Sequence, residues 1–250
     1  NGGAGSASDV CGSVSYSNDY GGLSNDCGAT GTATVTFTAT DNCGNSSSRT
    51  AVVTIEDTTP PTIDLSPQDT TINCSITGQD AAIQSWLDNH GGGTASDVCG
   101  SVTWTHDYTN NLSDLCGASG TIDVTFTAND DCGNPTTATA TLTVQDNTDP
   151  TIDVNASDLT VECDGAGNTT DLNNWLSSNG GASASDDCSN VVWSNEITDT
   201  KDNCGGTSET TYTFTATDDC GNSTSTTATF TIEDTTPPTI STFASDTTLN

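Results

Sequence analysis

Carboxylates are the side chains with the greatest capacity for chemistry in this 250-residue sequence, since Asp and Glu number 34 against two Lys and Arg. The acids gather at three recurring places: a Pro-containing linker, an S-D-x-C loop and a D-x-C-G-N loop. A net charge of −32 needs local neutralisation, because self-repulsion otherwise destabilises a compact fold. We expect the strands of this chain to form a β-sandwich in which the two loops share one end, where the linker also arrives. We therefore expect carboxylates from all three segments to converge.

Converging carboxylates, with Asn side chains and backbone carbonyls nearby, favour Ca²⁺, which takes about six to eight oxygen ligands, over Mg²⁺. Zinc and copper are disfavoured because the cysteines are expected to be oxidised and the histidines do not recur. The alternative is a solvated acidic surface with diffuse counter-ions. The predicted calcium ligands are Glu56, Asp57, Asp97, Asp130, Asp131, Asp146, Asp149, Asp186, Asp187, Asp218, Asp219, Glu233 and Asp234.

Eleven cysteines beside almost no lysine indicate an oxidising, extracellular compartment, where disulfides support domains with small cores. A full repeat holds four cysteines, which allow three pairings. A bond between Cys116 and Cys132 would join opposite ends of one predicted strand, beyond the ~7 Å between Cα atoms that a disulfide tolerates. The loops of Cys99 and Cys132 are expected at one end of the sandwich.

We therefore predict bonds within repeats, which leave Cys27 unpaired. They are Cys11–Cys43, Cys99–Cys132 and Cys188–Cys220, with Cys74–Cys116 and Cys163–Cys204 as a second set. A rival scheme joins Cys99 to Cys116 and Cys132 to Cys163, and it leaves Cys220 unpaired.

The histidines do not indicate catalysis, because His90 and His106 are replaced by Asn179 and Asn195 in the next copy of the pattern. The sequence also contains no G-x-S-x-G nucleophile elbow and no C-x-x-C zinc pair. We therefore expect no enzyme. Two cationic side chains cannot bind a phosphate backbone, and an anionic membrane would repel this chain, so nucleic-acid and membrane partners are excluded. No apolar run approaches the ~18 residues of a membrane span.

Internal repetition organises the whole chain. The cysteine of the S-D-x-C loop recurs as Cys11, Cys99 and Cys188, and the other landmarks return with the same period of 88 to 89 residues. We predict a partial repeat over 1–56, complete repeats over 57–145 and 146–233, and the start of a further repeat over 234–250. This is the pattern expected of a window on a longer array.

Most of each repeat has the period-two alternation of half-buried strands, as in Val124, Phe126 and Ala128 between threonines. The exception is a segment with Ile83, Trp86 and Leu87 at helical spacing. It predicts a short helical turn that places a Trp on the sandwich and that Gly91 terminates; Leu172, Trp175 and Leu176 repeat it.

The predicted fold is therefore all-β, with tandem immunoglobulin-like β-sandwich repeats that each carry a short helical turn. We expect Trp86, Trp104, Trp175 and Trp193 in the cores, rather than as platforms on which sugars stack.

Each repeat resembles the tandem repeats of very large Bacteroidota surface proteins. The resemblance lies in the order of its motifs: D-T-T-P-P-T-I, then D-x-C-G, then T-F-T-A-T-D-x-C-G-N and an alternating Thr-rich strand. The pattern is similar to HYR domains and to repeats of the SprB-type gliding adhesin, although the helical turn departs from the HYR pattern. The resemblance implies a stalk or filament exported by the type IX system and working in adhesion or gliding. Its implied partners are neighbouring repeats and, through a tip outside this segment, surface polysaccharide or other cells.

D-T-T triplets resemble the O-glycosylation acceptor of the same bacteria, which implies modification of Thr58, Thr70, Thr235 and Thr247. The alternative is chance occurrence in a Thr-rich chain. The predicted function is a non-catalytic, calcium-stiffened and disulfide-stapled stalk segment of a cell-surface adhesin. The alternatives are spacer or carbohydrate-binding repeats of a secreted polysaccharide-degrading enzyme, and a self-assembling filament without an adhesive tip.

Overall fold

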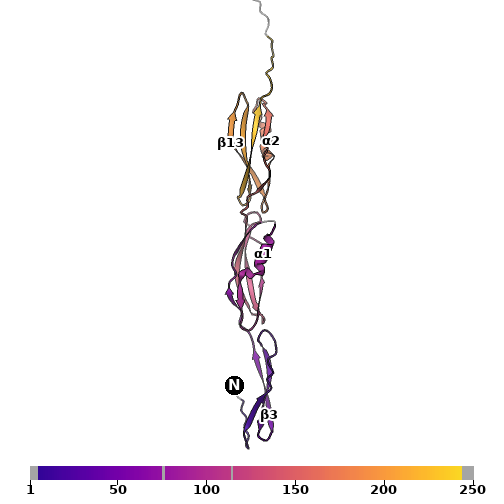
Figure 1. Ribbon diagram of the computed structural model, residues 1–250, viewed down its shortest axis with the longest axis vertical. Helices are drawn as coiled ribbons and strands as arrows, with labels where there is room; N and C mark the ends of the chain where they lie inside the picture. The colour runs from indigo at the N-terminus through magenta and orange to yellow at the C-terminus, as the bar shows by residue number, and fades with distance from the viewer. Residues whose placement is uncertain (1–4, 75–76, 114, 244–250) are drawn as a thin grey trace, which may run out of the picture. The chain divides into compact units, whose positions relative to one another are not determined.

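The computed structural model describes residues 5–74, 77–113 and 115–243 (Figure 1). The chain divides into two compact units. The first contains Asn1–Thr70, Asp80–Asn111 and Ile122–Thr143, and the second contains Thr71–Gln79, Leu112–Thr121 and Val144–Asn250. The division passes through the second repeat, so each unit contains one junction between consecutive repeats. The repeat boundaries after residues 56, 145 and 233 stay a prediction.

The first repeat contributes one antiparallel sheet of three strands in the order β1-β2-β3. The strands are β1 (Val14–Asn18), β2 (Gly31–Asp41) and β3 (Ser46–Ile55). Alternation in β2 buries Ala33 and Val35, whereas Phe37 and Ala39 on the same face are only half-buried. No helix covers this sheet among the described residues of the first repeat, which explains the partial burial.

The second repeat forms a four-stranded sheet of order β5-β9-β8-β7 and a separate β4-β6 pair. Its elements are β4 (Thr62–Leu65), β5 (Thr70–Asn73), α1 (Gln79–Asp88), η1 (His90–Gly92), β6 (Thr94–Ser96), β7 (Val102–His106), β8 (Gly120–Asp130) and β9 (Pro135–Gln145).

The third repeat has the same layout, with a sheet of order β11-β15-β14-β13 and a β10-β12 pair. Its elements are β10 (Thr151–Val154), β11 (Leu159–Glu162), α2 (Thr169–Ser177), η2 (Asn179–Gly181), β12 (Ser183–Ser185), β13 (Val191–Asp202), β14 (Ser208–Asp218) and β15 (Ser223–Glu233). Strand β11 runs parallel to β15, and the other pairs in its sheet are antiparallel.

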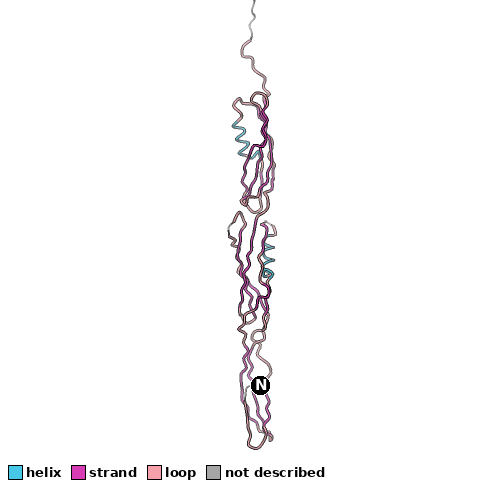
Figure 2. Tube along the Cα trace, turned by 90° about the vertical axis from the view of Figure 1, so that its left-hand side faces the viewer, coloured by secondary structure: helices cyan, strands magenta, loops and turns pink. Residues whose placement is uncertain are grey.

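Each full repeat places its helix beside the strands, as Figure 2 shows for α1 and α2. Trp175 in α2 is the centre of the third core: its ring lies 5.2 Å from Phe214 and 5.6 Å from Tyr212, centroid to centroid. The Trp175 Nε1 donates a hydrogen bond to the Ser157 carbonyl (3.0 Å), which satisfies the one polar atom of the ring. The buried core comprises Trp175, Tyr212, Phe214, Ala228, Phe230 and Ile232.

The second repeat uses the same packing, with Ile83 and Leu87 of α1 buried and the Trp86 ring 5.2 Å from Phe126. The helix α1 ends at Asp88, before Gly91, which was expected to terminate it. Gly91 lies within η1 with φ 62°, a left-handed conformation that a residue without Cβ adopts readily. Trp104 and Trp193 are half-buried rather than fully enclosed. The strands and packed helices confirm the predicted all-β sandwich repeats with short helices. In the described part of the chain, no helix combines the length and apolarity needed to cross a membrane.

Candidate functional site

Disulfides join consecutive repeats. Within the first unit Cys27 bonds Cys132, with their Cα atoms 5.2 Å apart. Within the second unit Cys116 bonds Cys220, with the same 5.2 Å Cα separation. The two bonds link equivalent cysteines and span nearly equal sequence separations, 105 and 104 residues, so they are one bond repeated. A third bond, Cys74–Cys188, spans 114 residues at the second junction.

These bonds overturn both predicted pairing schemes. Cys27, predicted to be unpaired, is bonded, and so is Cys220, which the rival scheme left alone. The cysteines left as free thiols are Cys11, Cys43, Cys99, Cys163 and Cys204.

The reason lies in where the loops point. Cys116 precedes β8 and Cys132 follows it, so they lie at opposite ends of the repeat, as predicted. The Cys116 end meets the next repeat and the Cys132 end meets the previous one. The nearest thiol therefore belongs to a neighbouring repeat rather than to the same one.

A tight C-G-x-[ST] turn presents each forward-facing cysteine. The Ser119 hydroxyl and N–H both donate to the Cys116 carbonyl, at 2.5 and 2.9 Å. The N–H of Ala118, which lies inside this turn, donates to the Cys188 carbonyl of the following repeat (2.8 Å). In the first repeat, Ala29 donates to the Cys99 carbonyl in the same way (2.7 Å).

The glycine of this turn allows the backbone of the next repeat to approach closely. Gly28 and Gly117 have φ of 53° and 55°. A Cβ on either would lie 2.2 or 2.6 Å from the carbonyl oxygen of Cys99 or Cys188, respectively. The positions therefore need glycine for conformation and for space. Sequence reasoning missed this docking turn, although its signal, C-G-x-[ST] in every repeat, was visible.

The D-x-C-G-N loop ties each repeat to the linker that enters it. Asn134 donates from Nδ2 to the Asp57 carbonyl (3.2 Å), and Asn222 donates to the Asp146 carbonyl (3.3 Å). The same amides bond the Asp130 and Asp218 carboxylates, at 2.7 and 2.8 Å. Burial acts to raise the pKa of Asp130, but hydrogen bonds from Asn134, Cys132 and Gly133 outweigh it and lower that pKa.

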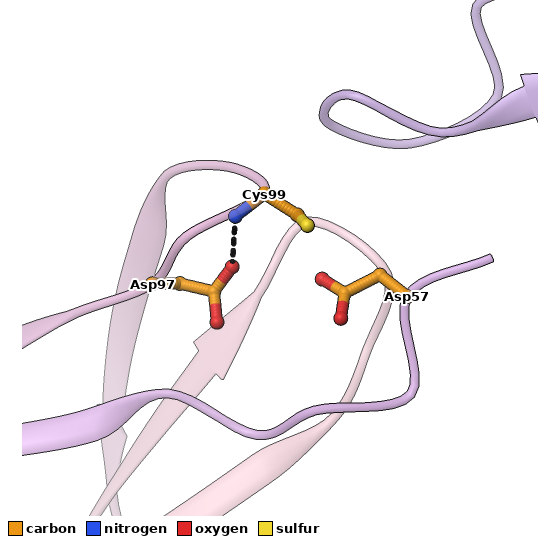
Figure 3. A group of neighbouring side chains, drawn as sticks. All are labelled: Asp57, Asp97 and Cys99. Atoms are coloured by element: carbon orange, nitrogen blue, oxygen red, sulfur yellow. Dashed lines mark hydrogen bonds between the residues drawn. The ribbon is translucent and has the colours of Figure 1, made fainter. Parts of the chain in front are cut away.

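A linker acid and an S-D-x-C acid meet at each junction. Figure 3 shows the carboxylates of Asp57 and Asp97 facing one another beside the Cys99 sulfur, with the Cys99 N–H donating to Asp97 (2.7 Å). The ligand atoms of these three residues lie within 4.8 Å of one another. Burial, followed by the charges of Asp57, Asp97 and Asp130, raises the pKa of the Cys99 thiol, which disfavours its reactive thiolate form.

The equivalent cluster in the second unit is Asp146, Asp186 and Cys188, again within 4.8 Å. Its sulfur is in a disulfide, so only the two carboxylates remain as metal ligands. Asp146 is 6% exposed. Its Oδ1 accepts from the Thr148 N–H (3.1 Å), but its buried Oδ2 has no hydrogen-bond partner among the described residues. Burial, then Asp186 and Asp218, raises the pKa of Asp146.

The other predicted calcium ligands are placed differently. Asp131 accepts hydrogen bonds from Ser101, Asp219 from Asn190, and Asp149 from the Ser223 N–H. Glu56, Asp187, Glu233 and Asp234 are exposed. The structure thus brings together one linker acid and one loop acid at each junction and spreads the rest around them. Calcium binding itself stays a prediction.

The predicted glycosylation sites differ in accessibility. Thr58 and Thr235 are exposed, and Thr70 is half-buried at the start of β5. The Thr235 hydroxyl donates to Glu162 (2.8 Å). Thr247 lies outside the described residues.

No protein-family model and no curated protein matches this chain. Solved structures do match. A protocadherin gammaB7 EC3-6 cis-dimer structure is 14% identical with a TM-score of 0.28, and the match covers 81% of this chain and 58% of that one. Protocadherin gamma B2 extracellular cadherin domains 3–6 are 12% identical with a TM-score of 0.32, covering 82% and 59%.

Drosophila N-cadherin EC1-4 is 11% identical with a TM-score of 0.32, covering 90% of this chain and 68% of that one. This chain therefore spans less than two thirds of the first two structures. At this level of overall similarity, the fold assignment rests on the strand pairing described above.

Proposed function

We propose that this chain is a non-catalytic extracellular stalk segment of a large, repetitive cell-surface adhesin. The observation that carries the proposal is the disulfide that joins consecutive repeats at equivalent positions, Cys27–Cys132 and Cys116–Cys220. Such bonds persist outside the cell. They hold neighbouring repeats together even when noncovalent contacts fail, which suits a part that bears tension rather than one that binds a substrate.

The adhesive tip, and its polysaccharide or cellular ligand, belong to other parts of the protein in this proposal. Export by the type IX system and a role in gliding follow only from the resemblance of the repeats. Exposed Thr58 and Thr235 are the proposed sites of O-glycosylation.

Deleting residues 57–145 from the full-length protein on its native cell is expected to shorten a surface fibre by one repeat while leaving adhesion intact. The deletion keeps the period, because it joins Glu56 to Asp146 and leaves Cys27 able to bond Cys220. Electron microscopy of cells measures fibre length, and a cell-binding assay measures adhesion. Loss of an enzymatic activity, with fibre length unchanged, would refute the stalk function.

Calcium at the junctions is the second part of the proposal. The donors are hard oxygens, which suit Ca²⁺, and the Asp146 Oδ2 is buried without a hydrogen-bond partner in the part of the chain that the structure describes. A cation between Asp146 and Asp186 would stabilise both ionised carboxylates, and backbone carbonyls and water would complete its coordination. Asp57 and Asp97 form the corresponding pair in the first unit. Asp130 and Asp218 are held by their own turns, so they contribute nearby negative charge.

Asp146→Asn is expected to halve the calcium bound per chain and to remove the corresponding thermal stabilisation. Ca²⁺ at about 100 times its dissociation constant would stabilise a site by about 2.7 kcal/mol. Isothermal titration gives the stoichiometry and thermal melts give the stabilisation. Asp187→Asn is the matched control, since it removes the same charge at an exposed position of the S-D-x-C loop, next to Asp186. If the two variants had equal effects, the proposed calcium site would be contradicted, and the acids would attract only a diffuse atmosphere of counter-ions.

In the presence of a chelator, the pKa of Asp146 predicts that the free energy of unfolding of the unmodified chain depends on pH, and Asp146→Asn tests this. The folded-state pKa of Asp146 is raised, so the folded state holds the proton more tightly than the unfolded chain does. Its stabilising contribution is therefore present at low pH and lost as pH rises through the raised pKa. Without calcium, Asp146→Asn is expected to flatten this loss.

A further inference from the structure

The Cys74–Cys188 disulfide ends beside the carboxylate pair of the second junction. The ligand atoms of Asp146, Asp186 and Cys188 all lie within 4.8 Å of one another, and Cys188 is 7% exposed. While the bond is closed, the sulfur cannot bind a metal as a thiolate, so only the two carboxylates of this cluster are donors. Opening the bond would give the pair a sulfur ligand at the place where that sulfur already lies.

Hydrogen bonds from the protein hold both carboxylates in place. The Cys188 N–H donates to Asp186 Oδ1 (2.9 Å), and the Ser189 N–H and hydroxyl donate to the same oxygen (3.0 and 3.2 Å). The Thr148 N–H donates to Asp146 Oδ1 (3.1 Å). One oxygen of each carboxylate is thus fixed, as is usual for carboxylates that bind a metal.

The other oxygen of Asp146 points to a cation independently of the cluster. Asp146 is 6% exposed, and its Oδ2 is buried without a hydrogen-bond partner among the residues that the structure describes. Such an oxygen is costly, because neither water nor a donor replaces its lost hydration. A cation bound by Asp146, Asp186 and the Cys188 sulfur would remove this cost.

A pocket of about 580 Å³ opens onto these groups and gives a metal ion a route to them. Asp186, Cys188 and Asn190 line it, together with Gly117 and Ala118 of the preceding repeat. The cluster is therefore accessible although two of its three residues are buried.

A sulfur ligand changes which metal the cluster suits. Two carboxylates alone are hard donors, which favour Ca²⁺. Zinc binds Cys sulfur at about 2.3 Å and carboxylate oxygen at about 2.0–2.2 Å, so ligand atoms on one zinc ion lie at most about 4.5 Å apart. The present spacing, within 4.8 Å, needs only small side-chain rotations. The prediction that zinc is disfavoured assumed oxidised cysteines, and it applies only to the closed bond.

We propose that the Cys74–Cys188 disulfide controls the metal preference of the second junction. Closed, the junction presents the carboxylate pair proposed above for Ca²⁺. Opened, it presents a Zn²⁺ site in which Cys188 joins Asp146 and Asp186, and water takes the fourth tetrahedral position. This inference rests on the junction site of the proposed function and gives its regulation.

Small thiols open the bond by thiol–disulfide exchange. Two reduced glutathione molecules supply two protons and two electrons, the S–S bond between Cys74 and Cys188 breaks, and each cysteine becomes a thiol. One oxidised glutathione molecule leaves. Zinc then displaces the proton of the Cys188 thiol, and water accepts it.

The first test uses the unmodified chain at a fixed ratio of reduced to oxidised glutathione, with and without Zn²⁺. Because Zn²⁺ binds only the opened form, it should raise the reduced fraction of Cys74 and Cys188. Alkylation of thiols followed by peptide mapping measures each bond separately. The Cys116–Cys220 bond of the same junction is the internal control and should not respond. No response to zinc, or equal responses of the two bonds, would overturn the proposal.

A matched pair of variants opens the bond without a reductant. Cys74→Ser leaves Cys188 as a thiol and Cys188→Ser leaves Cys74 as a thiol, while both lose the same bond. Cys99→Ser is added to both, so that the cluster of the first unit has no thiol.

The Cys74→Ser variant should bind Co²⁺, a spectroscopic substitute for zinc, with a thiolate-to-cobalt charge-transfer band. It should bind Zn²⁺ at least about 100-fold more tightly than Cys188→Ser does, since even outer-shell residues contribute about 10–100-fold to metal affinity. Adding Asp146→Asn should remove this advantage, and adding Asp187→Asn should not.

If loss of the bond unfolds the second unit, Zn²⁺ should restore folding in the Cys74→Ser variant and not in the Cys188→Ser variant. Equal zinc affinities of the two variants would contradict the site. The calcium proposal fails separately, because it is tested on the oxidised chain. A chain that binds no Ca²⁺ can still bind zinc once Cys188 is a thiol, and the deletion that tests the stalk function involves no metal.

Discussion

Replacing Cys116 and Cys220 with serine is expected to lower the free energy of unfolding by about 4–5 kcal/mol. The bond spans 104 residues, and in the chain-entropy model a loop of this size restricts the unfolded chain by about that amount. Chemical denaturation of the oxidised chain, followed by tryptophan fluorescence, measures the change. The shift should appear in the transition of the second unit, where the bond lies.

Cys204→Ser is the matched control, because Cys204 occupies the same turn but is a free thiol. Its expected effect is close to zero. If Cys204→Ser were as costly as the double replacement, the loss would come from the turn itself and not from the bond between repeats.

Trp175→Ala is expected to destabilise the third repeat by about 3–5 kcal/mol, the usual cost of emptying a large aromatic site. The ring is buried, it contacts Tyr212, Phe214 and Phe230, and its Nε1 donates to a backbone carbonyl. Thermal unfolding of the single variant gives the measurement. Trp193→Ala, at a half-buried position of the same repeat, should cost clearly less.

The same variant separates the two interpretations of the tryptophans. If Trp175 stacked on sugar instead of packing in the core, its removal would weaken binding to a polysaccharide and leave the melting temperature unchanged. The edge-on packing against Phe214 favours the core.

The repeat pattern made the fold predictable. Val124, Phe126 and Ala128 alternate with threonine and are all buried in β8, because side chains of a strand point to opposite faces in turn. Ile83 and Leu87 face the core from α1 because their spacing places them on one side of a helix. The spacing of apolar residues along the chain determines which side chains of a strand or helix are buried, and this spacing can be read directly from the sequence.

The pairing of cysteines could not be predicted in this way. Bonding depends on which loops meet in space, and four cysteines with a fixed period fit bonds within repeats as well as bonds between them. The preferred scheme treated each repeat as a closed body, and Cys116 bonds Cys220 because the repeats instead meet end to end. The predicted convergence of the acids was correct only in part. Asp146 and Asp186 lie together, whereas Asp131 and Asp149 accept hydrogen bonds from other residues.

The bonds between repeats also determine how a pulled chain would extend. Tension that enters through Cys132 leaves through Cys116, so within the second repeat the covalent load path is β8 and its flanking turns, 16 residues long. A stretch of 16 residues spans at most about 55 Å, whereas an unfolded repeat of 89 residues would extend to about 300 Å. Strand β8 is already extended. An oxidised array would therefore transmit force almost without lengthening, even after its cores had melted, and reduction would convert the same polypeptide into an extensible tether.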